Sequence, residues 1–420
     1  MCSSASDIVP QSALSYARAG RTESYSLPRV VSISVLTFGC MVPVTMLVAG
    51  LKELVGDRFD AHPFWSHAFM SINMIGAILA GPIIGLLADS RYPRRVIATL
   101  ALGTDAILLS LLSFAPNLTI FMILRFVEGA AHILALSTLM ALASRWSGPQ
   151  RRGQMMGIVG AFMMFGTACG TRLGGVVWMH LHEYTFHVAA MISATMGFLA
   201  FLIVAEPPRE PTDVRRTGLC GLIREQPRLL VAYLYAFIDR FCVGVVITTF
   251  GLFLADVHGM DPSERSRTLV RFLLPFAALV YPAGWLVDRL GRVWTISLGS
   301  IGFGILFSMY GLASPAQLSV LMILSGVLSA VMFAPNLTLC ADLAPAHQRG
   351  SAFTGFNVAG SLGFIFGPLS AGTIYSVAAS LTTPAAAYES TFFFTGSLEV
   401  LCGLVTLPLL LRLKRQGVTR

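Results

Sequence analysis

Residues 157–175 read GIVGAFMMFGTACGTRLGG, an apolar run in which Gly166, Gly170 and Gly174 recur every four residues. Residues four apart lie on one face of an α-helix, so these glycines predict a strip without side chains against which a second helix can pack closely. Together with Gly157 and Gly175 we call these residues the glycine stripe. Such stripes are common in membrane helices, and by itself this one indicates close packing and nothing more.

The pattern occurs a second time, 197 positions further along the chain. This shift places Arg152, Gly153, Gly166, Gly170 and Gly175 on Arg349, Gly350, Gly363, Gly367 and Gly372, and Thr171 on Pro368. The chain is therefore predicted to be a tandem of two related halves. That organisation is typical of membrane transporters, whose substrate site lies between the halves.

The composition independently indicates a membrane protein. Of the 420 residues, 55% are hydrophobic and only 12% are charged, and the mean hydropathy is +0.73. A water-soluble protein of this size needs far more polar surface. The seven cysteines have neither metal-site nor disulfide-framework spacing, and most lie in apolar stretches, so we expect them to be packing residues.

Polar gaps divide the chain into apolar segments of about 20 residues each, the length that a bilayer-spanning helix needs. Twelve such segments lie near residues 30–51, 67–88, 96–115, 118–143, 154–179, 187–205, 229–255, 268–287, 293–313, 317–338, 351–378 and 391–411. We expect a cytoplasmic segment 1–29, an N-terminal bundle 30–205, a cytoplasmic linker 206–227, a C-terminal bundle 228–411 and a cytoplasmic tail 412–420.

The basic residues indicate the orientation of these segments. The net charge is +8, which by itself is compatible with nucleic-acid binding. All but eight of the 29 lysines and arginines, however, fall on the side that holds both termini. Five of the eight lie on the other side, and Arg125, Arg172 and Arg240 lie inside segments. The positive-inside rule predicts that both termini are cytoplasmic, so the charge reports topology and no nucleic-acid partner is expected.

Two loops and two helices resemble the motifs of the major facilitator superfamily. The loop after the eighth segment, GWLVDRLGR at residues 284–292, fits the family pattern GxLxDRxGR throughout. The loop after the second segment fits it in part: it keeps Gly85, Leu87, Ala88, Asp89, Arg94 and Arg95 but has Ser90, Tyr92 and Pro93. Arg125 and Gly129 are similar to the family's RxxxG motif, and residues 157–175 resemble its antiporter motif Gx8Gx3GPx2GG except at Thr171.

The resemblance implies an all-α membrane protein with twelve transmembrane helices in two pseudo-symmetric six-helix bundles. It also implies that the two loops latch the cytoplasmic side in the outward-facing state; solvated turns with ordinary surface ion pairs are the alternative. The latch residues would be Gly85, Asp89, Arg94, Arg95, Gly284, Asp288, Arg289, Gly291 and Arg292. In the family the glycine stripe faces the eighth helix, in the other half. Gly363, Gly367 and Pro368 would form its second copy.

Arg172 lies about 200° around the fifth helix from Gly170, since each residue turns an α-helix by about 100°. It is therefore expected to point away from the glycine stripe. Two places are open to it: the substrate cavity, or the outer leaflet, where a long side chain reaches water.

Charged residues inside membrane spans are costly, about 2.5 to 3.5 kcal/mol each at the bilayer centre, so they are expected to have a use. Arg125, Glu128 and His132 share one face of the fourth helix. Arg125 and Glu128 are expected to pair, and the resemblance implies that the arginine assists proton transfer. The alternative is an internal ion pair that only fixes helix packing.

The seventh helix places Asp239 and Arg240 near the middle of the membrane. An arginine that moves toward and away from a buried carboxyl group can drive uptake and release of a proton there. Asp105 and Glu399 also fall near mid-depth and are further candidates; each of these charges is otherwise a paired structural group.

The sequence has no nucleophile–base pair and no phosphate-binding loop, so it predicts neither an enzyme nor a cofactor, and no metal ligand is assigned. It favours a multi-pass transporter of the cell membrane, expected to be monomeric, that exports a small organic molecule in exchange for protons. An uptake symporter or facilitator for a polar or anionic solute is the second possibility, with Arg172, Arg240 or Arg125 as the counter-charge. A membrane receptor or assembly factor on a transporter fold is the third.

Overall fold

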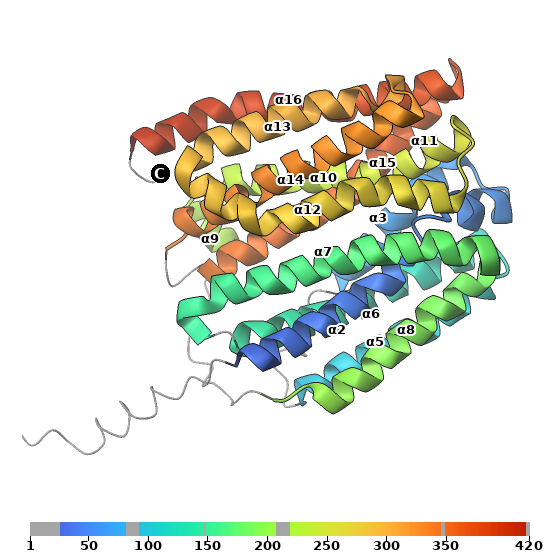
Figure 1. The fold of residues 1–420 in the computed structure, drawn as a ribbon, viewed down its shortest axis with the longest axis horizontal. Helices are drawn as coiled ribbons and strands as arrows, with labels where there is room; N and C mark the ends of the chain where they lie inside the picture. Colours follow the sequence, from blue (N-terminus) through green and yellow to red (C-terminus); the bar gives the residue numbers. More distant parts are fainter. Residues whose placement is uncertain (1–25, 81–91, 147, 207–218, 346–348, 417–420) are drawn as a thin grey trace, which may run out of the picture.

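The computed structural model describes residues 26–80, 92–146, 148–206, 219–345 and 349–416, and this part of the chain is almost entirely helical (Figure 1). The N-terminal half holds α2 (Leu27–Met46), η1 (Lys52–Asp57), α3 (Pro63–Leu79), α5 (Arg94–Ser113), α6 (Leu118–Trp146), α7 (Gly148–Leu181), η2 (His182–Tyr184) and α8 (Thr185–Ile203). The C-terminal half holds α10 (Leu229–Val245), η3 (Val246–Phe250), α11 (Gly251–Asp256), α12 (Pro262–Leu290), α13 (Arg292–Ser308), η4 (Tyr310–Leu312), α14 (Pro315–Leu343), α15 (Arg349–Ala379) and α16 (Pro384–Arg415).

Nine helical stretches in the described residues are long and apolar enough to cross a membrane. One of them, Ile158–Ile203, contains two helices, α7 and α8, joined by the short turn η2. The segments expected at 67–88 and 268–287 correspond to α3 and α12, which are not among the nine. The chain is thus a multi-pass membrane protein, and the count of twelve spans remains a prediction.

The helices form two bundles that lie side by side (Figure 1). In the N-terminal half α2 packs on α7, α5 on α8 and α3 on α6; in the C-terminal half α10 packs on α15, α13 on α16 and α12 on α14. The two halves meet through α7 with α12 and through α15 with α3. Each of these pairs has its counterpart in the other half, so the internal repeat of the sequence is also a repeat of the packing.

The glycine stripe packs against its own half, which corrects one expectation. A Cβ atom on Gly166 would lie 2.4 Å from the carbonyl oxygen of Phe38, and one on Gly174 would lie 2.0 Å from that of Met46, both on α2. Gly170 likewise faces α2. The expectation that the stripe faces the eighth helix is therefore wrong for these three glycines. In the second copy, Gly363 and Gly367 face α10 in the same way.

Gly175 does face the other half. A Cβ atom there would lie 2.5 Å from the carbonyl oxygen of Pro262 on α12, and one on its counterpart Gly372 would lie 2.8 Å from Cβ of His67 on α3. One residue turns a helix by about 100°, so Gly175 leaves the face that Gly174 shares with α2. Gly157 lies in α7, where the side-chain surroundings are not described.

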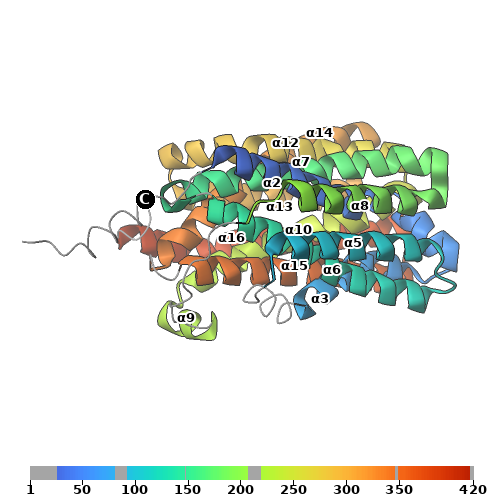
Figure 2. The same ribbon diagram turned by 90° about the horizontal axis from the view of Figure 1, so that it is seen from below.

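The ends of several elements differ from the ranges expected from hydropathy. The last helix, α16, begins at Pro384 and ends at Arg415, whereas the apolar segment was expected at 391–411. The Thr383 side chain caps its first turn by accepting a hydrogen bond from the Ala386 amide, which a hydropathy profile does not register. The linker contains a short helix, α9 (Leu219–Glu225), at the edge of the molecule (Figure 2).

The first helix of each half ends in a wider turn. The π-helix η1 follows α2, and the π-helix η3 directly continues α10. The 197-residue shift carries Lys52 in η1 onto Thr249 in η3, so the two π-helices occupy equivalent places. Both lie at the end of the bundles away from the start of α2 and the end of α16 (Figure 1).

Candidate functional site

The N-terminal half encloses an ion pair on α6. Arg125 Nη1 lies 2.5 Å from Glu128 Oε2, and both side chains are fully buried. Asn73 on α3 donates a hydrogen bond to the same oxygen at 2.6 Å. The guanidinium carbon of Arg125 also lies 4.3 Å from the ring centre of Phe69, a distance that favours a cation over an aromatic face. The expected pairing of Arg125 with Glu128 is therefore present.

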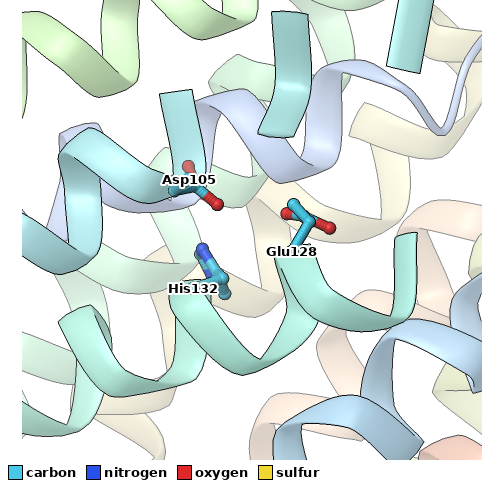
Figure 3. Close-up of side chains that lie close together, drawn as sticks. All are labelled: Asp105, Glu128 and His132. Atoms are coloured by element: carbon cyan, nitrogen blue, oxygen red, sulfur yellow. The ribbon is translucent and has the colours of Figure 1, made fainter. Parts of the chain in front are cut away.

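Two further ionisable groups complete a cluster around Glu128 (Figure 3). One ligand atom each from Asp105 on α5, Glu128 and His132 lies within 4.8 Å of the others, and all three residues are buried. Ser193 on α8 donates to Asp105 Oδ2 at 2.6 Å, and Cys40 Sγ on α2 lies 3.9 Å from His132 Nδ1. The helical period predicted His132 beside Glu128, but no local sequence pattern could predict that Asp105 on α5 lies next to them.

The second charged pair lies on α10. Arg240 Nε is 3.5 Å from Asp239 Oδ2, a longer and looser contact than the pair on α6. The Asp239 side chain is 7% exposed and the Arg240 side chain 23% exposed, and the guanidinium lies over the rings of Phe333 and Phe364. Arg240 is therefore the more accessible of the two in-span cations described so far.

Glu399 does not join the Asp239–Arg240 pair. It is fully buried on α16, hydrogen-bonds Ser300 on α13 and lies 3.4 Å from Cys242 Sγ on α10. No cation contacts it among the side chains that the structure describes. Each half thus contains a buried carboxyl group joined to serine across its third and sixth helices: Asp105 with Ser193, and Glu399 with Ser300.

Arg172 reaches from α7 to the other half of the molecule. Its Nη1 donates to Ser263 Oγ at 2.9 Å and to Ser266 Oγ at 3.2 Å, both on α12. It points away from the three glycines that face α2, as its helical angle predicts, and shares with Gly175 the face that contacts α12. Because the stripe faces α2, this direction leads into the interface between the halves.

The same end of the interface holds charged contacts that the sequence analysis missed. Lys52 Nζ lies 2.8 Å from Asp256 Oδ1, and Arg265 pairs with Glu53. Tyr388 donates to Asp256 Oδ2 at 2.7 Å. The hydrogen bond to Asp256 raises the pKa of Lys52 above its ordinary value. We call Lys52, Glu53, Asp256 and Arg265 the outer clasp. Opposite charges at the outer ends of the first, seventh and eighth segments were the signal available in the sequence.

Two uncharged contacts extend the outer clasp into the bundle. His67 Nδ1 on α3 lies 2.9 Å from Thr249 Oγ1 in η3, and Ser71 Oγ donates to the carbonyl oxygen of Ile365 on α15 at 2.8 Å. With the outer clasp and Arg172, these contacts close the two halves against each other at the end that the charge distribution assigns to the outside.

The structure describes only some of the predicted latch residues. Gly85 and Asp89 lie outside the described residues, and nothing is described of the side chains of Gly284, Asp288, Arg289 and Arg292. Gly291, with φ +82°, provides the left-handed turn that separates α12 from α13. Arg94 is the first residue of α5, and the amide of Arg95 donates a hydrogen bond to Glu206 Oε1 at 2.8 Å. The latch remains a prediction.

Two helical bundles related by an internal repeat, with charged side chains buried in each, define a multi-pass membrane transporter. The chain belongs to the Major Facilitator Superfamily, whose family model matches residues 33–261 and 229–419. The resemblance inferred from the loops is thereby confirmed, and this family consists of transporters rather than enzymes.

Relatives and solved structures agree with this assignment. Magnetosome protein MamH of Paramagnetospirillum magneticum is 25% identical over 409 residues, covering 90% of this chain and 91% of MamH. The quinolone resistance protein NorA of Staphylococcus aureus is 27% identical over 184 residues, 44% of this chain and 45% of NorA. A bacterial homologue of the human lysosomal transporter Spinster, inward-facing and unoccupied, superposes with a TM-score of 0.73 at 16% identity over 91% of this chain and 97% of its own. A D-xylose–proton symporter gives 0.73 at 15%, again over 91% and 97%. These structural likenesses show the fold.

Proposed function

We propose that this chain is a secondary active transporter that exports a small organic molecule in exchange for protons. The observation that carries the proposal is the pair Asp239–Arg240, a buried carboxyl group beside a partly exposed arginine in the middle of the seventh segment. The partial match to a quinolone resistance protein supports export. Glu128 and Arg125 are the corresponding proton-handling groups of the N-terminal half.

The transport cycle follows from the two bundles. In the described residues, the ion pairs between the halves belong to the outer clasp, so this clasp must separate for a cavity between the bundles to open on that side. Rocking of the bundles would break the outer clasp and close the other end. We expect the protein to act as a monomer in the cell membrane, with both termini in the cytoplasm.

The looseness of the Asp239–Arg240 contact also favours a second function, uptake or facilitated passage of an anionic solute. Arg240 is partly exposed and makes a 3.5 Å contact with its carboxylate, so an anion has only a weak partner to displace. Arg125, fully buried and held at 2.5 Å by Glu128, is less suited to this role.

Purified protein in sealed vesicles distinguishes the two functions. Under an imposed pH gradient, addition of a substrate that the protein carries should move protons, and Asp239→Asn should abolish this movement. Asp60→Asn is the matched control, because Asp60 is exposed and asparagine tolerates its left-handed backbone, φ +47°. Substrate movement that is indifferent to pH and unaffected by Asp239→Asn, but lost in Arg240→Met, would reject proton exchange and support the second function.

A further inference from the structure

We propose that Asp105 and Glu128 hold a single proton between them, and that this pair, joined across α5 and α6, is the proton-binding site of the N-terminal half. The inference rests on the proposed proton coupling for its role in transport, but the occupancy of the pair stands on the geometry alone. Figure 3 shows the two carboxyl groups approaching each other, with His132 beside them.

Each carboxyl group has one oxygen that is held and one that is not. Ser193 holds Asp105 Oδ2, while Arg125 and Asn73 hold Glu128 Oε2. Asp105 Oδ1 and Glu128 Oε1 are buried and receive no donor from any other group in the described residues. One oxygen of each carboxyl group lies within 4.8 Å of the other. Two carboxylates offer acceptors only, so neither can satisfy the other's free oxygen unless one of them carries a proton.

With both carboxyl groups ionised, the cluster would carry an unbalanced net charge of −1. Arg125 contributes +1, and two ionised carboxylates would contribute −2. The other groups that face the pair are His132 on α6 and Cys40 on α2, whose charged forms burial disfavours, and the uncharged Asn73 and Ser193. An unbalanced charge in such a site costs several kcal/mol, so the cluster is stable only with one added positive charge.

A proton satisfies these conditions better than a metal ion. The three convergent atoms of Asp105, Glu128 and His132 resemble the ligands of a divalent transition metal. Such an ion would change the net charge from −1 to +1, next to the fixed guanidinium of Arg125. A sodium ion would balance the charge, but hard cations require several oxygen ligands and an imidazole nitrogen is not among them. A shared proton leaves the cluster neutral and supplies the missing donor.

Release of this proton would place two like charges within 4.8 Å of each other, with one arginine to balance them. The repulsion acts between α5 and α6, and through Ser193 and Asn73 it reaches α8 and α3. The pair therefore connects the loss of one proton to the packing of four helices in the N-terminal half.

Infrared spectroscopy of purified protein, without substrate, tests the pair directly. Wild type near neutral pH should show the carbonyl band of a protonated carboxyl group that both Asp105→Asn and Glu128→Gln remove. Either change leaves one carboxylate beside Arg125, which is balanced and needs no proton. Glu399→Gln is the matched control, since it removes a buried carboxyl group of the other half and should leave this band in place.

Two outcomes would overturn the inference. One is that the proton proves not to be shared. This would be shown by a band that only one of the two substitutions removes, or by the loss of every such band in the Glu399→Gln protein. The other is saturable binding of Mn²⁺ or Na⁺ to wild type that Asp105→Asn abolishes, which would make the cluster a metal site. If a substituted protein fails to fold, the inference is still overturned when Glu399→Gln and Asp239→Asn together remove every band of a protonated carboxyl group. Neither outcome bears on proton exchange through Asp239, which the vesicle assay measures separately.

Discussion

Individual charged residues of this protein differ in how firmly they are held. Arg125 has a carboxylate at 2.5 Å and an aromatic face below it, whereas Arg240 has a carboxylate at 3.5 Å and partial exposure. A fixed charge is suited to keeping a site neutral, and a loosely held one to exchanging partners during a transport cycle. The first role can be tested by stability and the second by transport.

Arg125→Met should destabilise the protein by about 3 to 5 kcal/mol, because it leaves Glu128 and Asp105 without their cation. Combining it with Glu128→Gln should recover much of the loss. Thermal unfolding in detergent measures both, with the exposed Arg267→Met as control. Equal stability of wild type and Arg125→Met would show that the ion pair contributes nothing.

Lys52 makes the stability of the outer clasp depend on alkaline pH. Its pKa in the folded protein is raised by the hydrogen bond to Asp256, so its contribution is complete below the ordinary value of 10.5 and is lost as the pH rises through the higher, folded value. Above pH 10.5 the melting temperature of wild type should therefore fall more steeply than that of Lys52→Met. Parallel curves for the two proteins would contradict this expectation.

At the scale of helices, the glycines of one motif make two kinds of contact, one within their own half and one with the other half. Gly166, Gly170 and Gly174 let α7 approach α2 within its own half, and Gly175 lets it approach α12 in the other. The first contact holds a bundle together, and the second must open and close if the bundles rock. Neighbouring glycines of one stripe therefore pack against different halves of the molecule.

Gly174→Ala should destabilise the N-terminal bundle by about 1 to 3 kcal/mol, since its Cβ would lie 2.0 Å from the backbone of Met46. Gly160→Ala, in the same helix, is the control: nothing lies within 4 Å of its Cβ, so alanine should be neutral or stabilise by up to about 1 kcal/mol. Denaturation of the two proteins side by side measures the difference. Equal effects would show that α7 and α2 are not in close contact.

Gly175→Ala should act on the conformation rather than on the fold, because its Cβ would press on Pro262 and Ser266 across the interface. We expect the outer end to open more often. Thr249 is buried at this end. In the Gly175→Ala protein, Thr249→Cys should therefore react faster with a membrane-impermeant maleimide than the same cysteine does in a protein that keeps Gly175. Faster labelling in Gly174→Ala but not in Gly175→Ala would assign the two contacts the other way round.

At the scale of the whole molecule, the sequence predicted what repeats and what is periodic. The 197-residue shift predicted two equivalent halves, and the helical period predicted Arg125, Glu128 and His132 on one face. It could not predict that Asp105 joins them, because that contact depends on how α5 leans on α6. The outer clasp escaped for the same reason: Lys52 and Asp256 are far apart in the chain and meet only when the halves do. The direction of the glycine stripe was wrong because a motif specifies closeness but not the partner.

The expected topology is testable as a whole. Single cysteines placed near residues 3 and 418 should both react only from the cytoplasmic side, because most basic residues lie on the side of the termini. Membrane-impermeant labelling of intact cells and of inverted vesicles provides the measurement. Reaction of the two positions from opposite sides would require an odd number of spans and exclude two equal six-helix halves.

A π-helix follows the first helix of each half, α2 and α10. A π-turn holds one more residue than the α-turn it replaces, and such turns recur where helices change shape in use. Passage of a π-turn along the helix would rotate whatever lies beyond it by about 100° without unwinding the rest. Deleting one residue from η3 would fix that rotation permanently and turn Asp256, which lies beyond this turn, away from Lys52. The extra residue of the π-turn η3 thus sets the direction in which Asp256 faces its partner Lys52.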